Sequence, residues 1–160
     1  MATRTRKTPI QLNFRSEQTV VVTPESEDRF VIAEREAARA CQHLQEMSNW
    51  SKSFERFLSF IHQWSQEHAS WVEATYVDVA EIGLRVEVCT NKEDYDFAID
   101  DEVTEFDITL AEKFPMCPAE VTQIPKQEHV RSDLVSETTM VVYGDSQRTR
   151  GASGSQSEVS

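Results

Sequence analysis

Residues 82–124, IGLRVEVCTNKEDYDFAIDDEVTEFDITLAEKFPMCPAEVTQI, contain the pattern that decides the fold. The stretch begins with apolar residues at every second position over 82–89, which predicts a strand with one buried and one wet face. Residues 93–114 then place an apolar residue every three or four positions, which predicts a helix. AEVTQI (119–124), bracketed by prolines, predicts a short second strand. Two strands joined through a helix should lie parallel in one sheet.

The segments around this unit extend the sheet and add two more helices. Residues 71–80 (WVEATYVDVA) predict a strand, and the very short connection to residue 82 predicts an antiparallel hairpin. Further strands are expected near 10–14, 19–22 and 138–144, and helices from about Thr23 to Leu44 and from Phe54 to His68. The order β-α-α-β-β-α-β predicts an α+β fold, with a small mixed β-sheet and helices packed on it.

The chain is expected to form one domain with two tails. Residues 9–143 carry the periodic apolar pattern, so they are assigned to the single α+β domain. Residues 1–8 are basic and lack an apolar run, which predicts a flexible tail. Residues 144–160 are small and polar without periodicity, which predicts a disordered tail.

The charge of the chain is strongly negative and unevenly distributed. The formal net charge is −12, and residues 91–130 alone carry eleven carboxylates against three lysines. Such a field repels nucleic-acid phosphates and anionic lipid surfaces, so no nucleic-acid or membrane partner is expected. No window has the length and apolar character of a membrane span. A charged protein partner would be basic.

The three cysteines indicate a reducing compartment. Their number is odd and their spacing wide, which disfavours a disulfide framework and favours free thiols in the cytoplasm. Cys89 shares the wet face of its strand with Arg85 and Glu87, so it is expected to be exposed at a strand end. Cys117 is expected in a loop packed against the end of the sheet. Cys89 and Cys117 are the candidate reactive thiols, although nearby carboxylates would raise the pKa of Cys89.

The acidic helix is the other candidate site. Residues 93–114 hold nine carboxylates and one lysine, and the acids flank an apolar stripe made of Tyr95, Ile99, Val103, Phe106, Leu110 and Phe114. A solvated helix face is the simplest interpretation, and a surface for a basic partner is the functional alternative. The candidate partner-binding residues are Asp96, Asp100, Asp101, Glu105 and Asp107. A calcium loop would need a glycine and a di-metal site a Glu-x-x-His motif, so no metal is predicted.

Recognisable reaction chemistry is missing from the sequence. It has neither a glycine-rich phosphate loop nor a Gly-x-Ser-x-Gly elbow, and no cofactor is predicted. The leading hypothesis is therefore a non-catalytic protein-interaction or regulatory module, with a basic protein or a second copy of the chain as partner. The alternative is an enzyme whose site gathers a cysteine and carboxylates at the sheet edge near Cys89 and Asp94.

Overall fold

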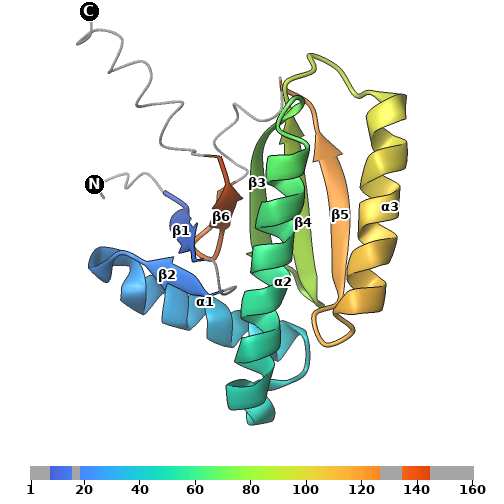
Figure 1. Cartoon of the computed structure of the whole chain (residues 1–160). Coiled ribbons are helices and arrows are strands. Elements are labelled where there is room, and N and C mark those ends of the chain that lie inside the picture. The colour runs from blue at the N-terminus through green and yellow to red at the C-terminus, as the bar shows by residue number, and fades with distance from the viewer. Residues whose placement is uncertain (1–7, 16–18, 127–134, 145–160) are drawn as a thin grey trace, which may run out of the picture.

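The computed structural model of the protein describes residues 8–15, 19–126 and 135–144. The predicted tails 1–8 and 144–160 lie almost wholly outside the described residues. In chain order the elements are β1 (Ile10–Phe14), β2 (Val20–Val22), the 3-10 turn η1 (Pro24–Ser26), α1 (Glu27–Ala40), the 3-10 turn η2 (Leu44–Glu46), α2 (Met47–Glu67), β3 (Val72–Val79), β4 (Leu84–Thr90), α3 (Phe97–Lys113), β5 (Ala119–Ile124) and β6 (Met140–Tyr143) (Figure 1).

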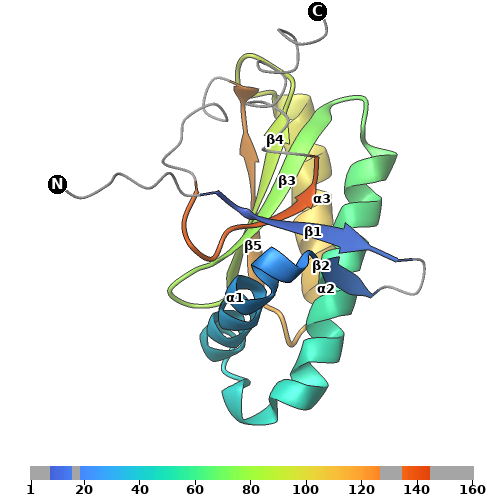
Figure 2. The same cartoon turned by 90° about the vertical axis from the view of Figure 1, so that its left-hand side faces the viewer.

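The sheet is mixed and has the strand order β2-β1-β6-β3-β4-β5, and Figure 2 views the molecule from the side of β1 and β2. Strands β3 and β4 form the expected antiparallel hairpin, and β4 and β5 pair in parallel across α3. The α+β prediction is therefore confirmed, including the parallel pair expected from residues 82–124. None of the described helices is long and apolar enough to cross a membrane.

The main core lies between the sheet and the helices. Helix α2 crosses the front of the sheet in Figure 1, and α3 runs beside β5. The two helices meet through aromatic rings, since Trp64 of α2 stacks on Phe106 of α3 with ring centroids 3.9 Å apart. The largest fully buried side chains of α2 are Trp50, Phe54, Phe57, Leu58 and Ile61. Each such side chain contributes roughly 1.5–3 kcal/mol through burial, so this seam holds the helices on the sheet.

The hairpin turn depends on a glycine. Gly83 has φ +77°, and a Cβ there would lie 2.7 Å from the carbonyl oxygen of Pro118. Its N–H donates to Ala40 O at 2.9 Å, while the N–H of Leu84 donates to Pro118 O at 2.9 Å. The turn therefore holds together the end of α1, the start of β4 and the segment before β5. These contacts explain why the hairpin forms although its turn lacks the Asn-Gly pair that is typical of tight hairpins.

Helix α3 begins later than the periodicity predicted. Its first residue is Phe97, and the side chain of Asp96 accepts hydrogen bonds from the N–H groups of Ala98 and Ile99 as the N-cap. Because the helix starts after this cap, Tyr95 precedes the helix. Its side chain is 45% exposed, so it does not belong to the buried stripe, contrary to the prediction. The remaining positions of the stripe are confirmed as buried or half-buried: Ile99, Val103, Phe106, Leu110 and Phe114.

The other face of the sheet is less wet than predicted. Cys89 is fully buried, so its expected exposure is wrong. It belongs to a second apolar cluster whose members are Ala74, Tyr76, Cys89, Ile124 and Val141. Cys89 is buried by the neighbouring strands, because β4 is an interior strand and Cys89 lies in register with Ala74 of β3 on one side and Ile124 of β5 on the other. The alternation along one strand does not contain that information.

Candidate functional site

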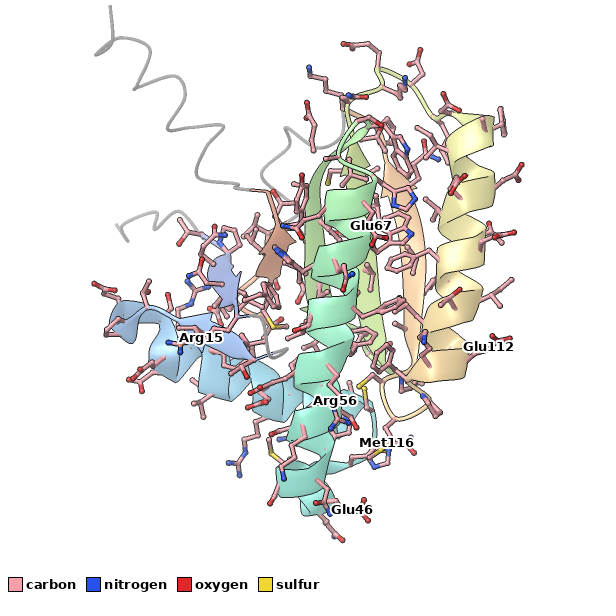
Figure 3. All side chains as sticks on the ribbon, in the orientation of Figure 1. Arg15, Glu46, Arg56, Glu67, Glu112 and Met116 are labelled. Atoms are coloured by element: carbon pink, nitrogen blue, oxygen red, sulfur yellow. The ribbon has the colours of Figure 1, made fainter. Side chains whose placement is uncertain are left out.

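The solvent side of α3 combines apolar and acidic side chains. Phe97 and Ile108 are 79% and 53% exposed, and three exposed carboxylates share their side of the helix. These two apolar residues and three carboxylates follow one another at steps of four, four, three and four residues. They therefore form one stripe on the side of the helix opposite the buried stripe. We call Phe97, Asp101, Glu105, Ile108 and Glu112 the outward face of α3. Figure 3 shows Glu112 pointing away from the sheet.

An aromatic pair extends this surface beyond the helix start. Tyr95 packs against Phe97 in an edge-to-face arrangement with ring centroids 5.3 Å apart. A hydrogen bond to Asp100 raises the pKa of the Tyr95 phenol. Both aromatic residues are exposed, so apolar area accumulates at the N-terminal end of the outward face. Exposed aromatic side chains of this kind are enriched where proteins bind one another.

The five predicted partner-binding carboxylates do not share one surface. Asp101 and Glu105 belong to the outward face. Asp96 is the helix cap, and Asp100 lies on the flank beside Tyr95. Asp107 lies on the flank toward β5, where partial burial and the neighbouring Glu120 raise its pKa. The structure thus assigns only part of the predicted acidic patch to a partner-accessible surface.

The opposite flank of α3 is linked to α2 through a histidine. Glu102 Oε1 lies 3.7 Å from His68 Nε2, and the His68 ring stacks on Trp64 at 4.3 Å. By contrast, Asp101, Glu105 and Glu112 form no ion pair within the described part of the chain. Their charges remain available to a partner.

The thiol candidates are buried and lie far from each other along the sheet. Cys41, Cys89 and Cys117 are all free and buried. Burial, together with Glu87 and Glu73, raises the pKa of Cys89 well above its usual value; burial and the nearby Cys41 raise that of Cys117. Cys117 precedes the start of β5, whereas Cys89 pairs with the last residue of that strand. Both candidate thiols are therefore buried whereas Asp94 is exposed, which disfavours a reactive thiolate at either cysteine.

A cluster of metal-binding side chains is also not observed within residues 8–15, 19–126 and 135–144. No three histidine, cysteine, aspartate or glutamate side chains come together there in a way that could hold an ion. At the start of α3, Asp96 caps the helix, Asp100 contacts Tyr95 and Glu102 lies near His68, so these three acids face different neighbours.

A buried polar network on β3 was missed by the sequence reasoning. Asp78 is only 2% exposed and accepts hydrogen bonds from the hydroxyls of Thr138 (2.5 Å), Thr139 (2.6 Å) and Ser136 (2.8 Å). Arg85 lies 3.6 Å from the same carboxylate. Both carboxylate oxygens have partners, so the network attaches the segment before β6 to β3. Sequence gave no signal for it, because the partners are about 60 residues apart.

Comparisons with protein-family models, curated proteins and solved structures found no match to this chain. The function is therefore inferred from the side chains themselves.

Proposed function

We propose that the protein is a non-catalytic binding module that docks a basic, amphipathic protein segment on the outward face of α3. The observation that carries this proposal is the mixture on that face: Phe97 and Ile108 are exposed beside carboxylates that have no ion-pair partner within the described residues. A solvated helix face has no need of large exposed apolar side chains, whereas a helix-binding surface uses them as anchors.

The charge of the outward face determines the kind of partner. Asp101, Glu105 and Glu112 attract lysine and arginine side chains, and the net charge of −12 steers a basic segment toward the protein. A second copy of the chain is opposed on this face, because two identical acidic stripes would repel each other. The basic partner is therefore favoured over the homodimer. A cytoplasmic location is part of the proposal and is supported by the three unpaired cysteines.

The test is a fluorescence-anisotropy titration with a labelled synthetic helix of leucine and lysine. Two double variants divide the surface: D101N/E105Q removes charge, and F97S/I108S removes apolar area. D101N/E105Q is expected to weaken binding about three- to tenfold, because two exposed ion pairs together contribute on the order of 1 kcal/mol. F97S/I108S is expected to weaken it about tenfold or more, because burying two exposed apolar side chains against the peptide contributes at least about 1.4 kcal/mol. The matched control is E25Q/E27Q, which removes two exposed acids near the start of α1.

Four outcomes would refute the proposal. One is that E25Q/E27Q weakens peptide binding as much as D101N/E105Q does, because the effect would then depend only on the net charge of the protein. Another is unchanged binding in F97S/I108S. The third is a wild-type dimer in sedimentation that does not bind the peptide and that becomes more stable in D101N/E105Q. A helix of leucine and glutamate should not bind, and binding of that peptide would also contradict the proposal.

A further inference from the structure

A second surface feature, independent of the outward face, lies where α2 passes the end of α3. It is a cleft of about 390 Å³, and we call it the basic cleft. Its wall on α2 consists of Ser53, Arg56 and Phe60, and its wall at the end of α3 includes Lys113, Phe114 and Met116. Figure 3 shows Arg56 and Met116 near each other at the lower end of α2. The volume is within the range of small-molecule sites.

The electrostatics of the basic cleft are opposite to those of the protein as a whole. Arg56 and Lys113 bring two positive charges to one place in a chain of net charge −12. Neither cation forms an ion pair with any side chain that the structure describes. Unpaired cations of this kind favour an anionic ligand, and a guanidinium matches the two oxygens of a carboxylate.

The floor of the basic cleft is apolar and held in place. The ring of Phe60 lies under Lys113, with Nζ 5.6 Å from the ring centroid, and Phe114 packs on Phe60 at 5.6 Å. The loop after α3 is fixed because Trp50 Nε1–H donates to Met116 O at 2.8 Å. Such preorganisation reduces the entropy that a ligand loses on binding.

The backbone at the cleft argues against phosphate. The end of α3 presents carbonyl groups, which carry the negative end of the helix dipole. The N–H groups of Phe114 and Cys117 already donate to Leu110 O and Phe114 O, at 2.8 and 2.9 Å. The negative end of the dipole opposes every anion, but it opposes a doubly charged phosphate more than a singly charged carboxylate, and the N–H groups of Phe114 and Cys117 cannot offset it. A singly charged anion with an apolar body therefore fits better.

We propose that the basic cleft binds a small organic monocarboxylate with an aromatic or short acyl body. The carboxylate lies between Arg56 and Lys113, and the apolar body lies against Phe60, Phe114 and Met116. Because none of these residues belongs to the outward face of α3, the site does not depend on the function proposed above.

The test is an amide NMR titration of the full chain with 2-naphthoate, up to about 10 mM, a range suited to millimolar affinity. Saturable amide shifts are expected in residues 53–60 and in Lys113, Phe114 and Met116. The neutral analogue 2-naphthalenemethanol is expected to bind more weakly, because it lacks the charge. Arg56 and Lys113 are exposed, so R56Q/K113Q should fold normally and weaken binding about tenfold. K52Q, an exposed lysine of α2 outside the cleft, is the matched control and should bind like wild type.

Several results would overturn the proposal. These are the absence of saturable shifts near the cleft, equal binding of the alcohol, or R56Q/K113Q binding like wild type. Inorganic phosphate that displaces naphthoate at equal concentration would also overturn it, since the apolar body would then be irrelevant. F97S/I108S should bind naphthoate like wild type, so the test of the basic cleft can fail or succeed independently of the test of the outward face.

Discussion

The buried carboxylate of Asp78 offers the sharpest test of how this sheet is held together. Asp78→Ala removes an acceptor that receives three hydroxyl hydrogen bonds at 2.5–2.8 Å and one from the N–H of Val79 at 2.7 Å. Hydrogen bonds to a charged group contribute about 1.5–3 kcal/mol each. Their sum would be an overestimate, because Ser136 already lies 3.2 Å from both threonine hydroxyls and can partner them.

The expected loss for Asp78→Ala is therefore about 3–4 kcal/mol, near the lower end for breaking a buried charged network. Urea unfolding followed by tryptophan fluorescence measures it, since the chain has three tryptophans. With a slope of about 2 kcal/mol per molar urea, the midpoint should fall by about 1.5–2 M. Asp78→Asn keeps the shape and one acceptor, so a loss of about 1–2 kcal/mol is expected.

Two further variants show whether the reasoning holds. Thr138→Val removes one hydroxyl bond and should cost about 1 kcal/mol. Glu81→Gln, an exposed residue of the same hairpin, should stay within about 0.5 kcal/mol of wild type. If Asp78→Ala were as stable as Glu81→Gln, the network would not hold β6 to β3, and its structural role would have to be abandoned.

Other predictions follow from single side chains. Burial and the neighbouring Glu55 raise the pKa of Glu34 to about 7, so the fold loses stability as pH rises from 4.5 toward 7. Glu34→Gln should therefore stabilise at pH 8 by about 1 kcal/mol, discounted for solvent screening, and the gain should vanish below pH 4.5 in thermal melts. Asp96→Ala removes the cap of α3 and should cost about 1 kcal/mol in urea unfolding, whereas Asp96→Asn should cost less. Cys89 and Cys117 should react with a maleimide only as fast as the protein unfolds; labelling of native protein at the rate of a free thiol would contradict their burial.

Apolar spacing in the sequence was sufficient for the architecture around 82–124. The alternation in β4, the stripe of α3 and the prolines around β5 predicted a strand, a helix and a parallel strand, and the structure confirms all three. These patterns succeed because each element must bury one side, and the spacing of its own apolar residues identifies that side. The start of α3 was predicted less well, since the cap at Asp96 competes with the periodicity that continues through Tyr95.

The candidate site was only partly predictable. The acids of α3 could be identified from the chain, but their roles depend on neighbours from other elements. Gln123 of β5 accepts from Asp96 N–H and donates to Asp96 O, while Glu120 raises the pKa of Asp107. The periodicity of the sequence places these acids on two flanks of the apolar stripe, and tertiary contacts divide them further into a cap, two flanks and an outward face.

The chain by itself determined its class, its charge and the apolar stripes of its helices, because these properties depend on composition and on local spacing. Tertiary structure alone decided which groups meet. It buried Cys89 between neighbouring strands, brought Asp78 to hydroxyls about 60 residues away, and placed Arg56 beside the end of α3. Such encounters depend on strand order and helix packing, which no local pattern contains, so chemistry that needs several distant side chains becomes visible only in the folded molecule.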